Sequence, residues 1–164
     1  MKTILTPIDA SEVSDDVVAT ASELAKVIDA RVVLLRVVQP PVFTAEYTAV
    51  LENVAELITI GEQAAEKLLK EVKGRLTTQG LKVETMQATG APVVHILEQG
   101  EKLRADYIVM GSHGHTAFYD LLVGSTTHGV LKHAECPVVI VPPRKRRLAK
   151  DQSRDRTAFA TASG

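Results

Sequence analysis

The sequence predicts an α/β domain in which five parallel strands form an open, doubly wound sheet with the strand order 3-2-1-4-5. Short runs of β-branched and aliphatic residues alternate along the chain with stretches whose apolar residues recur at helical spacing. This alternation is typical of βαβ units around a parallel sheet. A chain of 164 residues with 45% hydrophobic and 24% charged residues also has the size and composition of one globular domain with a buried core.

The first elements follow from local patterns. Residues 2–9 (KTILTPID) read as a strand, and a helix follows whose apolar positions recur every three or four residues from Val13 until it ends near Asp29. Either Ser11 or Ser14 is the expected N-cap of that helix. Residues 31–38 (RVVLLRVV) form a continuous apolar run, which predicts a deeply buried second strand.

The later elements are predicted in the same way. A Pro-Pro pair at 40 and 41 marks a loop, Gly80 stops a long amphipathic helix, and Pro92 suits the first turn of the next helix. The helices are expected at 50–76, 92–103 and 125–132, and the strands at 81–88, 107–110 and 137–141.

Three glycines at fixed spacing carry the strongest functional signal. Gly111 and Gly114 are followed, after nine residues, by Gly124, Ser125 and Thr126. Because glycine has no Cβ, its backbone can take positive φ and an anion can approach its N–H group closely. The two hydroxyls add donors, and the N-terminus of the helix that follows favours negative charge. The pattern predicts a phosphate-binding loop, although glycines also mark plain turns and helix ends.

Other polar and backbone groups are expected at the same edge of the sheet. Asp9 ends the first strand, Val37 and Val38 end the second, and the glycine loop follows the fourth. In a doubly wound sheet, ligands bind outside the carboxyl ends of the strands, where the strand order reverses. Two interpretations of Asp9 stay open, since a lone carboxylate there is either a ligand contact or a helix N-cap.

Five segments together resemble the universal stress protein family. They are residues 4–9 (ILTPID), 35–38 (LRVV), 106–114 (DYIVMGSHG), 124–126 (GST) and 136–141 (CPVVIV), and the resemblance covers residues 1 to about 143. The family's G-x2-G-x9-G-[ST] pattern, which distinguishes its ATP-binding members, is matched without a gap. The resemblance implies a Rossmann-like fold of the adenine nucleotide alpha hydrolase type.

The resemblance also implies a ligand, which is ATP, or ADP or AMP, with Mg²⁺ or Mn²⁺ bridging the phosphates. Backbone groups of Val37 would read the adenine edge, and the Asp9 carboxylate would lie near the nucleoside. The adenosine contacts that it implies are Pro7, Ile8, Asp9 and Val37, flanked by Met110 and Gly111. Those to the ribose and phosphates are Gly111, Ser112, His113, Gly114, Gly124, Ser125 and Thr126.

One departure from the family bears on activity. Members often carry Lys or Arg just after the second glycine, whereas this chain has His115 and no Lys or Arg from Gly111 to Leu131. The phosphates would then be held by backbone N–H groups, hydroxyls, a cation and protonated His113 or His115. Phosphoryl transfer needs cationic clamps. We therefore expect a nucleotide-dependent sensor or regulatory module and not an enzyme; the alternatives are a slow ATP hydrolase or nucleotidyl transferase, and a nucleotide-independent adaptor.

Charge divides the chain into a domain, residues 1–143, and a tail, residues 144–164. The domain carries 12 Lys and Arg against 18 Asp and Glu, whereas the tail carries 7 against 2. The tail has few large apolar residues and is expected to be disordered. Its basic cluster at 144–147 is either a solvated run or a contact for nucleic acid or an acidic partner. The acidic domain argues against binding of duplex nucleic acid.

The last predicted strand, Pro137 to Val141, is β-branched and should form an edge of the sheet. Pairing with a second copy about a two-fold axis would satisfy its outer backbone groups, so we expect a homodimer, with an unknown protein as regulatory partner. No segment is long and apolar enough for a membrane span, and no secretory signal is visible, which favours the cytoplasm. The single cysteine, Cys136, excludes an intramolecular disulfide and is expected to be a small buried residue.

Overall fold

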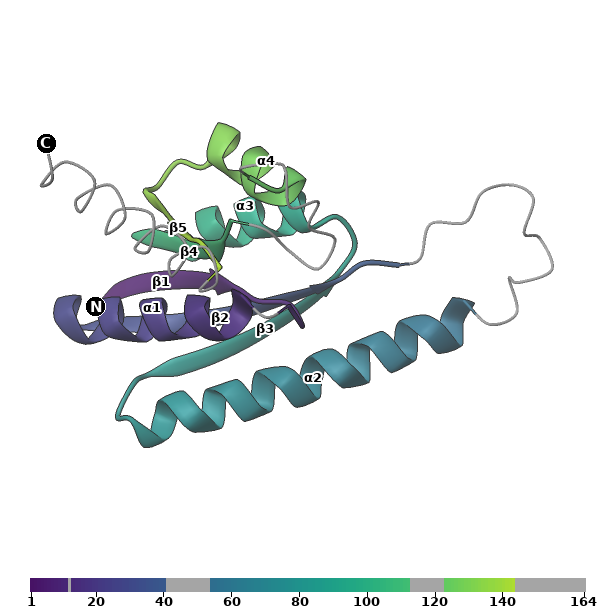
Figure 1. Cartoon of the computed structure of the whole chain (residues 1–164), viewed down its shortest axis with the longest axis horizontal. Coiled ribbons are helices and arrows are strands. Elements are labelled where there is room, and N and C mark those ends of the chain that lie inside the picture. Colours follow the sequence, from purple (N-terminus) through teal and green to yellow (C-terminus); the bar gives the residue numbers. More distant parts are fainter. Residues whose placement is uncertain (12, 41–53, 113–122, 144–164) are drawn as a thin grey trace, which may run out of the picture.

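The computed structural model describes residues 1–11, 13–40, 54–112 and 123–143, and this part of the chain forms five strands and four helices (Figure 1). The strands are β1 (Lys2–Pro7), β2 (Ala30–Val38), β3 (Val83–Thr89), β4 (Tyr107–Gly111) and β5 (Val138–Val141). The helices are α1 (Val13–Ile28), α2 (Val54–Thr78), α3 (Pro92–Lys102) and α4 (Ser125–His133). The strands are parallel and lie in the order β3-β2-β1-β4-β5, which confirms the predicted fold class and strand order.

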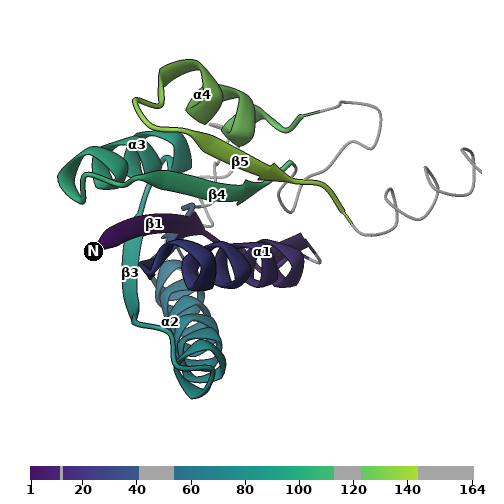
Figure 2. The ribbon, with the colours of Figure 1, turned by 90° about the vertical axis from the view of Figure 1, so that its left-hand side faces the viewer.

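Helices cover both faces of the sheet: α1 and α2 lie on one face, and α3 and α4 on the other (Figure 2). Successive side chains of a strand point to opposite faces, so each buried strand supplies two core layers. On β2, Val32 and Leu34 pack with the α1 and α2 side, whereas Val33 and Leu35 pack with the α3 and α4 side. This two-sided burial explains why β2 is a continuous apolar run.

The helices follow the predicted apolar spacing. In α1, buried Val13, Val17, Ala21 and Ala25 recur every four residues and form the stripe that faces the sheet. In α2, the buried residues begin only at Ala65, and the first turns of the helix extend beyond the sheet (Figure 1). The predicted start of α2 near 50 lies outside the described residues. None of the helices in the described ranges is long and apolar enough to cross a membrane.

Several predicted boundaries were wrong by one or two residues, and local chemistry explains each difference. β1 ends at Pro7, not at residue 9; Pro7 has no N–H group with which to continue a ladder. β3 begins at Val83, because Gly80 has a φ of 81° and the N–H of Leu81 still donates to Leu76 O at 3.3 Å, which closes the C-terminus of α2. Pro137 lies before β5 and contributes only its carbonyl.

Candidate functional site

β1, the central strand, ends before both of its neighbours, and we call the region beyond its end, between β2 and β4, the crevice. In a parallel strand, successive residues direct their backbone groups to alternate neighbours. The N–H of Ile8 donates to Leu35 O at 2.9 Å, so Leu35 faces β1, and Val37, two residues later, faces the same way. Pro7 is the last residue of β1 that pairs with β2. The peptide groups of Val37 therefore face the space beyond the end of β1.

The opposite side of this crevice is formed by β4. The N–H of Ile108 donates to Pro137 O at 3.0 Å and that of Ser112 donates to Val141 O at 2.9 Å, so these residues face β5. Gly111, which lies one residue before Ser112, therefore faces β1. Pairing of β1 with β4 includes only Ile4 and Leu5. The backbones of Val37 and Gly111 thus flank the point where the strand order reverses, which is where doubly wound folds bind ligands.

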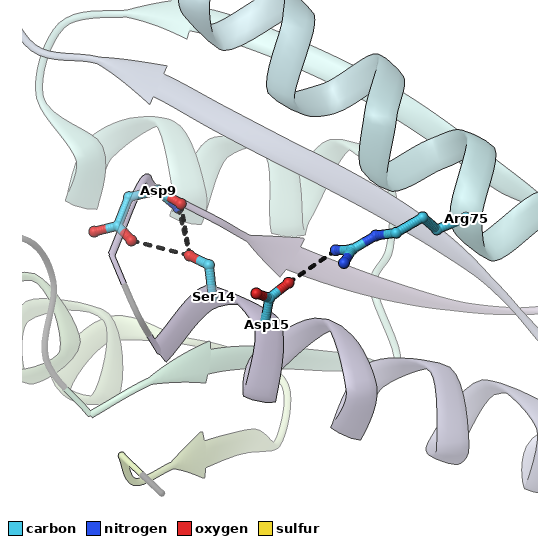
Figure 3. Close-up of polar contacts among 4 residues, drawn as sticks. All are labelled: Asp9, Ser14, Asp15 and Arg75. Carbon is cyan, nitrogen blue, oxygen red and sulfur yellow. Dashed lines mark hydrogen bonds and ion pairs between the residues drawn. The ribbon is translucent and has the colours of Figure 1, made fainter. Parts of the chain in front are cut away.

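The turn from β1 to α1 holds Asp9 in a defined position at this edge (Figure 3). Asp9 Oδ1 accepts from the N–H of Ser11 at 2.9 Å, and Ser14 Oγ lies 3.0 Å from Asp9 Oδ1 and 2.7 Å from Asp9 O. Ser14 Oγ also accepts from the N–H of Asp9 at 3.1 Å. Asp9 therefore organises the turn and does not cap α1, which begins at Val13. Ser14 lies inside the first turn of α1, so it is not the N-cap either.

A small cavity of about 240 Å³ lies beside Asp9, between α1 and α2. Apolar Val18, Leu68 and Val72 line it together with the polar residues of the turn. At its margin, Arg75 Nη2 and Asp15 Oδ1 form an exposed ion pair at 2.9 Å (Figure 3). Ligand pockets for molecules of nucleotide size usually measure about 300 Å³ or more. This cavity is therefore a recess next to the crevice and too small to hold a whole nucleotide.

Two hydrogen bonds tie the N-terminus of α4 to the end of β4. Thr127 Oγ1 donates to Gly111 O at 2.8 Å, and the N–H of Gly124 donates to Ser112 O at 2.7 Å. The first N–H bonded within α4 is that of His128, which donates to Gly124 O. The N–H groups of the preceding three residues consequently have no acceptor inside the helix. They lie next to Gly111, where the helix dipole favours an anion.

The backbone conformation at Gly124 does not require glycine, because its φ is not positive. Its φ and ψ are −68° and 159°, an extended conformation that any residue adopts, so the predicted conformational reason was wrong at this position. What glycine supplies at the N-cap of α4 is the absence of a side chain beside the exposed N–H groups. The carboxyl ends of the strands bring together the predicted residues Pro7, Ile8, Asp9, Val37, Met110, Gly111, Ser112, Gly124, Ser125 and Thr126. His113 and Gly114, with His115, lie outside the described residues.

Sequence reasoning missed three residues that the structure places at this site. Thr127 and Ser14 act by hydrogen bonds that position Gly111 and Asp9. The third is Arg36, whose Nη1 donates to Val37 O at 3.2 Å and brings a cation to the edge of the crevice. A carbonyl oxygen has two lone pairs, so Val37 keeps acceptor capacity. The signal for Arg36 was its place directly before Val37 at the end of an apolar strand.

Comparisons with known proteins agree with the fold and its site. The model of the universal stress protein family matches residues 1–142. Universal stress protein MJ0531 of Methanocaldococcus jannaschii is 35% identical over 146 residues, which are 88% of this chain and 84% of that protein. The solved structure of the protein MJ0577 superposes with a TM-score of 0.74 at 30% identity, over 86% of this chain and 95% of its own.

A more distant structure shares the fold alone. The universal stress protein of Archaeoglobus fulgidus, solved in complex with dAMP, superposes with a TM-score of 0.62 at 18% identity. The superposition covers 86% of this chain and 98% of that one.

Proposed function

Because the chain belongs to the universal stress protein family, we propose that it binds an adenine nucleotide in the crevice above β1 and acts as a nucleotide-dependent sensor or regulatory module. The observation that carries this proposal is the pair of peptide groups, on Val37 and Gly111, that face one another across the end of the central strand. The N-terminus of α4 lies directly beside Gly111. The dAMP complex of a protein with this fold supports the class of ligand.

The parts of the site suit the parts of a nucleotide. The backbone N–H and C=O of Val37 match the donor and acceptor edge of adenine, and the Asp9 carboxylate, held by Ser14, suits the nucleoside hydroxyls. The unbonded N–H groups at the start of α4 and the hydroxyls of Ser125 and Thr126 suit phosphate oxygens. Met110 is 4% exposed and its side chain belongs to the core on the α3 and α4 face, so it would support the crevice from below.

A divalent cation, Mg²⁺ or Mn²⁺, fits this site only as a partner of the phosphates. Within the described ranges, no group of three or more His, Cys, Asp or Glu side chains could hold a metal ion. Mg²⁺ often keeps several waters and is bound through substrate phosphates with few protein ligands, and hydroxyl oxygens suit it. The hydroxyls of Ser125 and Thr126 are the groups that would contact the cation, and its charge would offset that of the phosphates.

We expect binding without rapid turnover. The segment from Gly111 to Thr126 has no Lys or Arg, and Arg36 lies at the Val37 side of the crevice, away from the start of α4. Catalysis of phosphoryl transfer depends on cations at the transferred group. The alternative of a slow hydrolase or nucleotidyl transferase is separated by turnover with Mg²⁺ or Mn²⁺. A rate of about one per second or more would contradict the sensor function.

The nucleotide site is tested by calorimetric titration of nucleotide-free protein with ATP and Mg²⁺. Gly124→Val should abolish the binding heat and keep the circular dichroism spectrum, because φ and ψ there suit a β-branched residue, whereas its side chain would crowd the N–H groups of α4. The control is Gly74→Val in α2, where an added Cβ meets no atom within 4 Å. Wild-type protein that gives no heat at millimolar ATP would support the nucleotide-independent adaptor instead. Mass spectrometry of nucleotide released by denaturation identifies ATP, ADP or AMP.

We also propose a homodimer that forms through β5. In the described part of the chain, β5 pairs only with β4, so one edge has no partner strand. Pro137 O and Val141 O accept from β4, so the intervening alternate residues, Val138 and Ile140, direct their backbone groups to the outer edge. A second copy that pairs there in the antiparallel direction would satisfy these groups and close the assembly at two subunits. A nucleotide bound beside Ser112 would then affect the interface, because the N–H of Ser112 donates to the carbonyl of Val141, the last residue of β5.

A further inference from the structure

A second, larger cavity lies far from the crevice, at the amino ends of β4 and β5. It is a groove of about 650 Å³ between α3 and α4, the two helices on one face of the sheet (Figure 2). Its floor is apolar and includes Leu97, Ala105 and Ile108. We call it the α3/α4 groove. Its position at the opposite ends of the strands separates it from the proposed nucleotide site.

The rim of the α3/α4 groove is acidic. The rim carries one guanidinium, that of Arg104, and three exposed carboxylates, those of Glu98, Glu101 and Glu135. Glu98 lies 3.9 Å from Lys102 Nζ, at the outer limit of an ion pair. Among the described residues, Glu101 and Glu135 form no ion pair. An apolar floor beneath a rim on which two carboxylates have no ion pair with a described residue suits a basic segment that also carries an aliphatic side chain.

Such a segment follows the domain directly. Residues 144–164 contain seven Lys and Arg against two Asp and Glu, and they begin with RKRRL, in which an aliphatic Leu148 follows four cations. The family match ends at residue 142, so this tail is an addition to the shared domain. It starts three residues after Val141, the end of β5.

The position of β5 determines whether a subunit's own tail or the tail of its partner reaches the α3/α4 groove. Ile108, in the floor of the groove, pairs with Val138, the first residue of β5, so a chain's own tail leaves from the far end of that strand. A strand of four residues spans about 13 Å, and the tail would have to turn back over this distance. In an antiparallel pair of two β5 strands in which Val138 lies opposite the partner's Ile140, by contrast, the partner's Val141 lies beside Pro137. The partner's Arg144, three residues further on, then reaches the level of Ala134, next to Glu135.

We propose that, in the dimer, the basic start of each tail lies on the α3/α4 groove of the other subunit. The cations at 144–147 contact the carboxylates of Glu101 and Glu135, and Leu148 covers the apolar floor. This inference rests on the proposed dimer through β5. It gives that dimer two additional contacts, which are reciprocal because of the two-fold axis.

Charge reversal on the two sides tests this inference with the full chain. The groove variant is Glu101→Lys with Glu135→Lys, the tail variant is Arg144→Glu with Arg146→Glu and Arg147→Glu, and the control is Glu66→Lys with Glu71→Lys on the exposed face of α2. In the homodimer of the groove variant or of the tail variant, the tail and the groove that it contacts carry charges of the same sign. We therefore expect the dimer dissociation constant of each variant to rise about tenfold or more at low salt. The control should dimerise like the wild type.

Mixing the groove variant with the tail variant gives the decisive result. In a mixed dimer, one wild-type tail meets a wild-type groove and one acidic tail meets a basic groove, so both contacts are attractive. Random pairing of equal amounts of the two variants gives a heterodimer fraction of about one half. Native mass spectrometry should show a heterodimer fraction well above this value, and salt should reduce the excess. Random pairing would overturn the inference, because tails bound to their own subunit gain nothing from mixing. A monomeric wild type would instead refute the dimer itself, which separates the two failures.

Discussion

Replacing Thr127 by valine tests the connection between the glycine loop and α4. The Thr127 side chain is 2% exposed, and its hydroxyl donates to Gly111 O at 2.8 Å. Valine keeps the shape of threonine, so no cavity forms, but the Gly111 carbonyl loses this donor. The control is Thr77→Val, since the Thr77 hydroxyl donates to Lys73 O, also at 2.8 Å, on an exposed part of α2.

The expected magnitudes differ because the bond from buried Thr127 to Gly111 O is partly shielded from water, whereas the bond from Thr77 is exposed. A buried acceptor left without its donor costs about 1–3 kcal/mol of unfolding free energy. For a domain of this size, each kcal/mol lowers the melting temperature by about 2–4 °C, so we expect a decrease of about 2–12 °C for Thr127→Val. Lys73 O stays hydrated and bonded within its helix, so Thr77→Val should change the unfolding free energy by about 0.5 kcal/mol or less.

The same variant should weaken ligand binding. Without the bond from Thr127, the first turn of α4 is no longer tied to Gly111, so the N–H groups that would hold phosphate lose their fixed position. We expect ATP to bind about tenfold more weakly, which corresponds to about 1.4 kcal/mol. Urea denaturation gives the unfolding free energy, and calorimetric titration gives the affinity. The reasoning is refuted if Thr127→Val and Thr77→Val are alike in both measurements.

Two further substitutions test other parts of the structure. Ile140→Pro removes an N–H that faces only the outer edge of β5, so light scattering should show a monomer with an unchanged circular dichroism spectrum; a persisting dimer would place the interface elsewhere. Gly129→Ala should cost about 1–3 kcal/mol of stability, because its Cβ would lie 2.9 Å from Val93 Cγ2 between α3 and α4. Val93→Ala in the same chain should recover part of that loss, and a purely additive double variant would argue against the contact.

Ile140→Pro tests the outer edge of β5 more directly than charged substitutions at Val139 and Val141. Lysine at Val139 and Val141 would introduce charge at the edge, but Val141 is 2% exposed and belongs to the core on the α1 and α2 face. A buried lysine would destabilise each subunit, so loss of the dimer would not report on the interface. Ile140→Pro places no charge in the core and alters a donor that only a second copy requires; its loss of partly buried Ile140 packing is controlled by Ile140→Ala, which keeps the N–H and should still dimerise.

Periodicity predicted the fold because each helix and strand buries a regular stripe or face. The spacing of Val13, Val17 and Ala21 is enough to place α1, whatever it packs against. Boundaries were less predictable, since they depend on single backbone groups, as at Pro7 and Gly80. Leu81 looked like part of β3 because it is apolar, but its N–H closes α2 and its side chain fills the core from the turn.

The candidate site was predictable where topology decides it, and unpredictable where a particular hydrogen bond does. Parallel strands place their carboxyl ends together, so Asp9, Val37 and Gly111 had to share one edge of the sheet. The partners of these residues depend on the path of each loop and on side-chain rotamers. Ser14 was therefore interpreted as a possible cap, although its hydroxyl contacts Asp9, and Arg36 was seen only as part of a strand.

Pro7 connects the fold to the proposed function. Its ring removes a donor on the side of β1 that faces β4, and pairing between these strands includes only Ile4 and Leu5. β2 continues for three residues beyond Leu35, the partner of Pro7, so its backbone has no strand beside it on the β1 side. Val37 O accepts from Arg36 Nη1 and keeps a second lone pair, whereas no strand among the described residues pairs with the Val37 N–H. Backbone groups left unpaired at the centre of a sheet are costly unless something bonds them. A ligand that offers a donor and acceptor edge would satisfy them, which is why the early end of the central strand favours a nucleobase at this place.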